Sequence, residues 1–320
     1  MIMSAPWRVT HPFDRLRSLR MPADDYRLDL LLTPDTHPRT GKPRAGFETV
    51  VQCHAEDASR ALSLRATAQA ISAISNGIRP TPANSQVMRL NLDPQAALNL
   101  ADRLQAGTES GVPPQTLASS LFMRDIRLRV PGALLEFLDN YPGTDIRVVT
   151  AIHPSWCFKA NQLLLVDARK TTNQFRTHLN RAGITKAPGF LIAFLHGEFE
   201  PFSQEFQLHF HGICAGEKLK AFNRLRNKQG YVRTPKIYRP IVINQIQDRP
   251  RQLSYIMQSF WPKKARVPID GGDFYRRERT KTRIKEPFQS VYLMWLDQWR
   301  LSDLCLMNGV HIQGGKMVLS

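Results

Sequence analysis

Cysteine is scarce in this chain, and its copies are not arranged for a zinc knuckle or a disulfide framework. The four cysteines, Cys53, Cys157, Cys214 and Cys305, lie far apart and form no Cys-x-x-Cys pair. Widely spaced free thiols are typical of proteins from a reducing compartment. We therefore expect a cytoplasmic protein.

Long apolar runs are also missing. The segment 189–195 is among the longest, and it is far too short to span a membrane. The N-terminal arginines Arg8, Arg15, Arg17 and Arg20 are not followed by the apolar stretch of a secretory signal. The sequence has no Gly-x-x-x-x-Gly-Lys-Ser/Thr loop for binding a nucleoside triphosphate. These features predict no membrane partner and no nucleotide-driven step.

Acidic residues are in the minority. The chain has 44 Lys and Arg against 27 Asp and Glu, which gives a formal charge of +17 and a pI near 10.2. Residues 216–286 hold 19 Lys and Arg against 6 Asp and Glu, a net of +13. A positive field of this strength attracts polyanions. We therefore expect a nucleic-acid partner that binds near this segment.

A strand with two histidines is the most informative feature that the chain does have. Residues 206–213 read Phe-Gln-Leu-His-Phe-His-Gly-Ile. Side chains of a strand alternate between its faces, so the apolar residues 206, 208 and 210 can face a core. Gln207, His209 and His211 then share the opposite face. Two imidazoles in this arrangement can bind one divalent cation, although two solvent-exposed histidines on a strand are the alternative.

The elements around this strand predict an α+β fold with an antiparallel sheet. The expected order is strand 145–152, helix 161–181, strand 189–199, strand 205–214, helix 217–228 and strand 238–246. This β-α-β-β-α-β order is the split-βαβ pattern, in which the third strand is central. The histidines of that strand would then open onto a broad sheet face.

The chain divides into four parts by composition. We expect a flexible basic arm at 1–45 and a mainly helical accessory region at 46–142. The histidine-bearing domain covers 143–264. A basic linker and a C-terminal amphipathic helix, centred on 290–306, complete the chain at 265–320.

A helix with an outward tyrosine is expected soon after the last strand of the domain. Asp248 can cap it, and Pro262 ends it after Phe260. The apolar residues 253, 256, 257 and 260 form one stripe with helical spacing. Tyr255 falls nearly opposite this stripe, on the polar face. An ordinary surface tyrosine is the alternative interpretation.

Together these motifs resemble the HUH endonuclease superfamily, which includes rolling-circle replication initiators, conjugative relaxases and single-strand transposases. The resemblance rests on three segments: His209-Phe210-His211, the tyrosine segment 253–258, and the strand motif 148–154. It implies a single catalytic Tyr255 that nicks and rejoins one DNA strand through a 5′-phosphotyrosine intermediate. It also implies Mg²⁺ or Mn²⁺, a single-stranded or hairpin DNA substrate, a separate helicase, and a role in replication of a plasmid or phage-like element.

The third metal ligand is expected on the strand before the histidines. If the turn centres near 202–203, His209 pairs with a residue close to His196, and Glu198 lies one same-face step away. A carboxylate suits a hard cation, so Glu198 is favoured, with His196 as the runner-up and Glu200 behind it. Gln258 stands where initiators commonly carry a lysine, and some transposases use an amide there as a ligand.

DNA binding is predicted for three basic clusters interleaved with aromatic residues. The expected contacts are Lys218, Lys220, Arg224, Arg226, Lys228, Lys263, Lys264, Arg266, Arg276 and Arg277. The interleaved aromatics are Tyr231, Tyr238, Trp261, Phe274 and Tyr275. Two other functions stay open: a catalytically inactive nucleic-acid-binding protein with the same fold, and a histidine-dependent phosphoesterase without a covalent intermediate.

Overall fold

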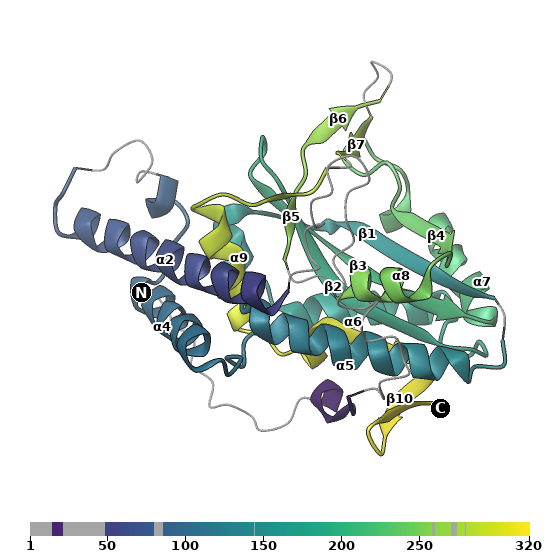
Figure 1. Cartoon of the computed structure of the whole chain (residues 1–320). Coiled ribbons are helices and arrows are strands. Elements are labelled where there is room, and N and C mark those ends of the chain that lie inside the picture. The colour runs from purple at the N-terminus through teal and green to yellow at the C-terminus, as the bar shows by residue number, and fades with distance from the viewer. Residues whose placement is uncertain are drawn as a thin grey trace.

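The computed structural model shows an α+β protein, with a mixed sheet and helices packed around it (Figure 1). It describes residues 15–21, 49–79, 86–143, 145–257, 260–269, 274–278 and 280–320. The predicted α+β class is confirmed. The expected arm at 1–45, apart from 15–21, and the candidate ligand Gln258 lie outside the described residues.

Three long helices form most of the described part of 46–142. They are α2 (Val50–Ser75), α4 (Pro94–Ser110) and α5 (Ser120–Asp139). Thr49, Asp93 and Ser119 cap their N-termini by accepting hydrogen bonds from backbone N–H groups. Helix α5 begins after the Ser119 cap and continues through Pro131.

The sheet is built around four strands, β1 (Ile146–Lys159), β2 (Leu191–Glu200), β3 (Glu205–Ala215) and β4 (Ile241–Gln245). Their order is β4-β1-β3-β2, and each neighbouring pair is antiparallel. The histidine strand β3 therefore has a partner on both sides.

Short strands extend the sheet and form two small hairpins beside it. The strands β5 (Pro262–Lys263), β8 (Thr282–Arg283) and β9 (Cys305–Asn308) lie beyond β2. The pairing of β5 with β2 is parallel, which makes the sheet mixed. The hairpins are β6 (Arg266–Pro268) with β7 (Tyr275–Arg277), and β10 (Val310–Gln313) with β11 (Lys316–Leu319).

Helices α6 (Ala168–Arg181) and α7 (Glu217–Asn223) pack on the apolar face of β3. The rings of Phe175 on α6 and Phe210 on β3 stack with centroids 4.3 Å apart. Phe222 of α7 packs edge-on against Phe175. The residues Phe206, Leu208 and Phe210 are at most 1% exposed, which confirms the predicted core face of this strand.

The opposite face of β3 carries the histidines and is covered as well. Helix α8 (Arg249–Ile256) lies over it, with α5 beside α8 (Figure 1). His209 is only 7% exposed as a result. The expectation of a broad open sheet face around the histidines is therefore wrong.

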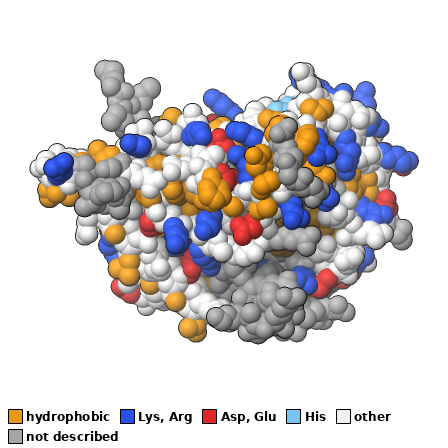
Figure 2. Space-filling model, turned by 90° about the horizontal axis from the view of Figure 1, so that it is seen from above, with side chains coloured by type: hydrophobic (Ala, Val, Ile, Leu, Met, Phe, Trp, Pro, Cys, Tyr) orange, Lys and Arg blue, Asp and Glu red, His pale blue; other side chains and the backbone are white. Residues whose placement is uncertain are grey.

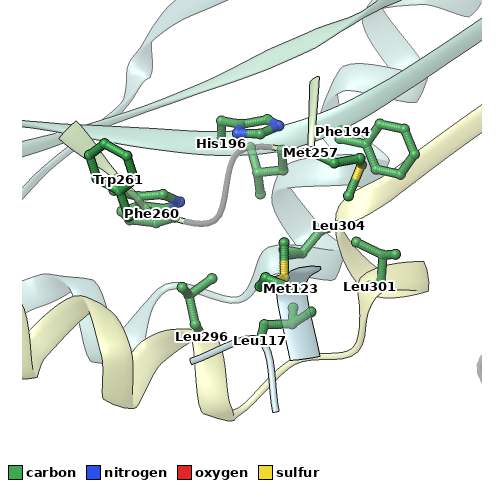
Figure 3. Close-up of a pocket in the computed structure, with 11 residues that line it drawn as sticks. Leu117, Met123, Phe194, His196, Met257, Phe260, Trp261, Leu296, Leu301 and Leu304 are labelled. Carbon is green, nitrogen blue, oxygen red and sulfur yellow. The ribbon is translucent and has the colours of Figure 1, made fainter. Parts of the chain in front are cut away.

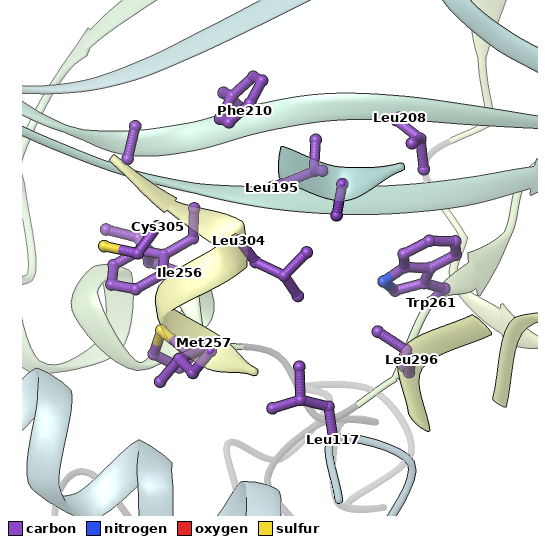
Figure 4. Packing of buried hydrophobic residues seen from close by; sticks show 14 of the residues in the cluster. Leu117, Leu195, Leu208, Phe210, Ile256, Met257, Trp261, Leu296, Leu304 and Cys305 are labelled. Atoms are coloured by element: carbon purple, nitrogen blue, oxygen red, sulfur yellow. The ribbon is translucent and has the colours of Figure 1, made fainter. Parts of the chain in front are cut away.

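Helix α8 is anchored by the residues at its end. Leu253, Ile256 and Met257 are all buried. Ile256 and Met257 lie with Leu304 in the cluster beneath the sheet (Figure 4). Burying a side chain of this size contributes roughly 1.5–3 kcal/mol. This packing holds the neighbouring Tyr255 in place over the sheet.

Four helices are shorter than the sequence predicts. Helix α6 begins at Ala168 instead of 161, and α7 ends at Asn223 instead of 228, because 3-10 turns take up the remaining residues. In the other two, the sheet edge recruits the residues that follow the helix. Helix α8 ends at Ile256 instead of Phe260, and the chain then pairs with β2 through β5. Helix α9 (Phe288–Asp297) ends before the expected 306, because β9 pairs with β2.

Short 3-10 helices are η1 (Arg15–Ser18), η2 (Ala160–Leu165), η3 (Arg224–Asn227), η4 (Gln229–Tyr231) and η5 (Leu301–Leu304). Among the helices of the described stretches, none combines the length and the apolar character needed to cross a membrane.

A buried carboxylate joins α2 to α5. Asp57 accepts hydrogen bonds from the Ser119 hydroxyl at 2.6 Å and from the N–H groups of Ser120 at 2.6 Å and Leu121 at 3.2 Å. Its other neighbour is Arg60, 3.7 Å away and equally buried. Asp57 thus satisfies the start of α5 and part of the Arg60 charge.

We predict that Asp57→Ala lowers the free energy of unfolding by about 3 kcal/mol, because it leaves buried N–H groups and a guanidinium without this acceptor. Urea unfolding measures the loss. Asp102→Ala is the matched control, since the Asp102–Arg65 pair at 2.9 Å lies at the surface and contributes at most about 1 kcal/mol. Equal small losses in both variants would contradict the structural role of Asp57.

Candidate functional site

Three histidines meet on one face of the sheet. The β2–β3 register places His196 directly across from His209, and Glu198 across from Gln207, as the turn predicts. The ring centroids lie 6.2 Å apart for His196 and His209, 5.6 Å for His196 and His211, and 4.6 Å for His209 and His211. The two strands thus bring together a compact group of imidazoles, which we call the histidine cluster.

Hydrogen bonds orient the rings of this cluster. His209 Nδ1 donates to the carbonyl oxygen of Gln207 at 3.3 Å, so its Nε2 keeps a free lone pair. His211 Nδ1 lies 2.8 Å from the hydroxyl of Thr150, its cross-strand neighbour on β1. His196 Nε2 is buried and has no hydrogen-bond partner among the described residues. Ring nitrogens are thereby left available for another ligand.

Burial keeps the cluster uncharged at neutral pH. Loss of solvation lowers the pKa of His209 to about 4 and that of His196 to about 3. The neighbouring His209 lowers the pKa of His196 further. For His209, in contrast, the carboxylate of Glu198 opposes the lowering of the pKa. The pKa of His211 also lies well below its ordinary value, first because of burial. Neutral imidazole is the form that binds a metal ion.

Glu198, the favoured third ligand, is engaged in ion pairs. Its carboxylate lies 2.7 Å from Nε of Arg277 and 3.2 Å from Nζ of Lys264, and it is buried. Burial alone would raise the pKa of this carboxyl, but Lys264 and Arg277 hold it below the ordinary value. The structure therefore puts His196, the runner-up, inside the histidine cluster and gives Glu198 two cations as neighbours.

The other carboxylates on this face serve the β2–β3 turn. Glu200 accepts hydrogen bonds from the N–H and the hydroxyl of Ser203. Glu205 pairs with Arg266 at 3.0 Å and with Lys159 at 3.1 Å. Glu200 is thus held at the turn, beyond Glu198 on the strand.

Tyr255 lies over the histidine cluster. Asp248 caps α8 by accepting from the N–H of Arg251, as expected from the sequence. The Tyr255 ring is half-buried, and its centroid is 5.8 Å from that of His211. The ammonium of Lys281 sits 3.7 Å from the centre of the Tyr255 ring. Burial raises the pKa of the Tyr255 phenol, and Lys264 opposes this shift.

The cluster has the chemistry of a metal site. Imidazoles that share one ion have ring centroids roughly 5 Å apart, since each metal–nitrogen bond is about 2.1 Å long. The neutral rings and the buried, unpartnered Nε2 of His196 fit such a site. In the described residues, however, no three His, Cys, Asp or Glu side chains are placed to hold an ion as they stand. Binding would therefore require a change in ring orientation.

A cavity of about 30 Å³ lies behind His196, between β2 and the ends of α5 and α9 (Figure 3). Its other walls are apolar and include Met257, Trp261 and Leu304. Such a volume holds about one or two water molecules. It is too small for a nucleotide and belongs to the packing behind the site.

The predicted DNA-binding residues separate onto two sides of the sheet. Helix α7 packs with α6 on the face opposite the histidine cluster. Lys220 is exposed there, and Arg224 donates to the carbonyl of Ala182. Arg226 and Lys228 are exposed on the adjoining η3 segment.

Lys218 requires a correction. It is 2% exposed, and its ammonium donates to the carbonyl of Ile184 at 2.7 Å. A buried ammonium cannot reach a DNA phosphate, so this lysine is structural. The basic residues near the histidine cluster are instead Lys264, Arg266 and Arg277, with Lys263 and Arg276 beside them.

Sequence reasoning missed two contributors to the site. Thr150 lies within the strand motif 148–154, but nothing in that motif indicated a contact with His211. Lys281 had no signal beyond its place in a basic run. Both depend on pairing between segments far apart in the chain.

We predict that acidification destabilises the protein through the histidine cluster. Between pH 6.5 and about 4, the unfolded chain binds protons at His209 and His196 that the folded chain excludes, so stability falls as the pH drops. The loss approaches about 1.4 kcal/mol per pH unit for each such histidine. Urea unfolding from pH 7 to 5 should therefore show a shallower pH dependence in His209→Asn. His311→Asn, at an exposed position on β10, is the control, and an unchanged slope in His209→Asn would contradict the prediction.

No protein-family model matches this chain, and neither do any curated proteins or solved structures. The functional assignment therefore depends on the arrangement of side chains around His196, His209, His211 and Tyr255.

Proposed function

We propose that this protein nicks and rejoins single-stranded DNA through a 5′-phosphotyrosine intermediate on Tyr255, with a divalent metal ion, during replication of a plasmid or phage-like element. The observation that carries the proposal is the position of Tyr255 beside the histidine cluster, with its ring 5.8 Å from that of His211. A nucleophile and a set of metal-binding groups at one point are what a strand-transfer reaction needs.

The strand order supports the same proposal. From the order β4-β1-β3-β2, with α6 and α7 on one face, we infer a split-βαβ arrangement for these four strands. The resemblance to HUH endonucleases implies such a sheet, with the histidine pair on the central strand. It also implies a tyrosine helix near those histidines, and α8 lies there.

The reaction uses the chain's own groups as follows. The Tyr255 phenol gives up its proton to solvent water, and its oxygen attacks the scissile phosphorus. A new phosphorus–oxygen bond to tyrosine forms while the bond to the 3′ oxygen breaks. That oxygen takes up a proton from solvent water and leaves as a 3′-hydroxyl. Attack by a 3′-hydroxyl on the phosphotyrosine reverses these steps and rejoins a strand without a nucleotide cofactor.

His209, His211 and His196 would hold the metal ion in this proposal. A bound Mg²⁺ or Mn²⁺ would offset the negative charge of the scissile phosphate. Three imidazoles favour Mn²⁺ over Mg²⁺, because nitrogen donors suit the softer ion better than the harder one. Glu198 then acts by positioning Lys264 and Arg277 instead of binding the ion.

Replication initiators commonly carry a lysine where this chain has Gln258. In the proposed reaction, two other lysines of this chain take over its role. Lys264 favours the deprotonated Tyr255 by lowering its pKa, against the effect of burial. The ammonium of Lys281 lies 3.7 Å from the centre of the Tyr255 ring and holds the ring by a cation–π contact. We assign to them the positioning and charge effects that a lysine on the tyrosine helix would have.

The proposal includes a separate helicase and a cytoplasmic location. The sequence has no phosphate-binding loop of its own for strand unwinding. The widely spaced cysteines favour a reducing compartment.

A catalytically inactive DNA-binding protein is the second candidate. Its support is that no three potential ligands in the described residues are arranged around an ion position. A histidine-dependent phosphoesterase would use the same cluster without Tyr255. The covalent adduct separates all three functions.

We predict a covalent adduct with random-sequence single-stranded oligonucleotides in the presence of Mn²⁺. When the oligonucleotide is labelled at its 3′ end, the label should appear on the protein, because the 3′ fragment keeps the phosphate bound to tyrosine. When it is labelled at its 5′ end, the label should appear on a free, shorter strand. Tyr255→Phe should reduce the adduct to background, and His209→Ala should reduce it about a hundredfold. Denaturing gel electrophoresis measures both.

Tyr141→Phe, at the end of α5, is the matched control and should behave as the parent protein. An adduct that survives Tyr255→Phe would move the nucleophile to Tyr231, Tyr238 or Tyr275. Binding without an adduct favours the inactive protein, and cleavage without an adduct favours the phosphoesterase.

We predict further that His196→Asn raises the Mn²⁺ concentration for half-maximal adduct formation by about tenfold or more, because it removes a ligand. Titration of Mn²⁺ against adduct yield measures this concentration, with Glu198→Gln as the comparison. If Glu198→Gln raises the concentration and His196→Asn leaves it unchanged, the third ligand is Glu198.

A further inference from the structure

An arginine is held by two aromatic rings next to the β6–β7 hairpin. The guanidinium carbon of Arg233 is 3.9 Å from the ring centre of Tyr238 and 3.8 Å from that of Phe274. We call these three residues the aromatic–arginine stack. Its two segments are joined by the backbone, since the N–H of Tyr275 donates to the carbonyl of Pro235 at 3.0 Å.

The stack continues into the hairpin of β6 and β7. Pairing places Arg266 opposite Arg277 and Val267 opposite Arg276. Arg266 and Arg277 point to the sheet, where they bind Glu205 and Glu198. Side chains alternate along a strand, so Arg276 points to the other side of the hairpin.

The arginines here fall into two classes. Those facing the sheet are neutralised by carboxylates, as just described. Arg233, Arg239 and Arg276 are exposed, and none of them pairs with an acidic residue in the described part of the chain. Figure 2 looks onto the side where β6 and β7 project, and Lys and Arg side chains gather there while acidic ones are sparse. This local excess of charge favours an anionic ligand.

The ring contacts indicate which anion fits. The contacts with two rings hold the Arg233 guanidinium in place, and its N–H groups can donate hydrogen bonds to a phosphate. Tyr275 is 39% exposed, so its ring can stack on an unpaired base. Arginines that donate hydrogen bonds to phosphates, beside an exposed aromatic ring, suit single-stranded nucleic acid. In a duplex the bases stack on one another and are not available to the ring.

The surface lies within reach of the histidine cluster. Arg266 contacts Glu205, which is four residues from His209 on the same strand. Four residues of a strand cover about 13 Å. A few nucleotides of extended single strand span this distance, so one strand can occupy both places.

We propose that the aromatic–arginine stack, with Tyr275, Arg239 and Arg276, binds the single-stranded DNA flanking the phosphate that Tyr255 attacks. The inference rests on the proposed function, because it takes the nicked strand as the ligand. Arg233, Arg239 and Arg276 bind its phosphates, and Tyr275 stacks on one of its bases. The hairpin thus sets the strand's path into the active site.

Fluorescence anisotropy with labelled random-sequence single-stranded DNA tests this proposal in the full chain. Tyr275→Ala should weaken binding about tenfold through loss of one base stack. Arg233→Gln and Arg276→Gln should each reduce the slope of log affinity against log salt by about 0.7. Oligonucleotides too short to reach from the histidine cluster to the hairpin should lose these effects.

Arg176→Gln on α6 is the matched control, because it removes one exposed charge on the opposite face of the sheet. Thermal unfolding checks that all variants are folded. Unchanged affinity in the three hairpin and stack variants overturns the inference, as does an equal loss in Arg176→Gln or a loss confined to duplex DNA. If the parent protein still forms the Tyr255 adduct in those cases, the proposed function stands without this surface.

Discussion

The pairing of β2 with β3 is the constraint on which the rest of the site depends. It sets His196 against His209 across the sheet and places His211 two residues further along the same face. Close backbone and ring contacts fix this register. A side chain at Gly197 would fall 2.4 Å from the Trp261 ring, and one at Gly212 would fall 2.1 Å from the carbonyl oxygen of Ile192. A slip of β3 by one residue would turn His209 and His211 to the apolar face and separate them from His196 on β2.

Along this one face, imidazoles and carboxylates have separate tasks. The histidines are buried and neutral, with one ring nitrogen of His209 fixed by a carbonyl. Glu198 and Glu205, closer to the turn, are charged and hold Lys264, Arg266 and Arg277. The ion pairs neutralise both carboxylates, and one of the paired cations, Lys264, lies near enough to Tyr255 to lower the pKa of its phenol. The proposed chemistry needs both groups: uncharged imidazoles to bind the metal ion, and cations held in fixed positions by the carboxylates.

The excess positive charge of residues 216–286 lies in several separate places in the fold. Part of it lies on α7, behind the sheet, and one of its lysines is buried against Ile184. Part is balanced by the carboxylates of β2 and β3. Another part lies on the β6–β7 hairpin and the neighbouring stack, where no described acid pairs with Arg233 or Arg276. A charge count along the sequence locates the basic segment, but only the fold separates these environments.

The sequence by itself determined the local features of this protein: the apolar face of the histidine strand, the register of its hairpin, the helix caps and the start of the tyrosine helix. These follow from alternation, turn residues and capping, which act over a few positions. The tertiary structure decided that His196 joins His209 and His211 in the cluster, that Glu198 pairs with Lys264 and Arg277, that Lys218 is buried and that Lys281 rests on Tyr255. Those outcomes depend on burial and on charges brought in by distant segments, and neither is encoded in the spacing of neighbouring residues.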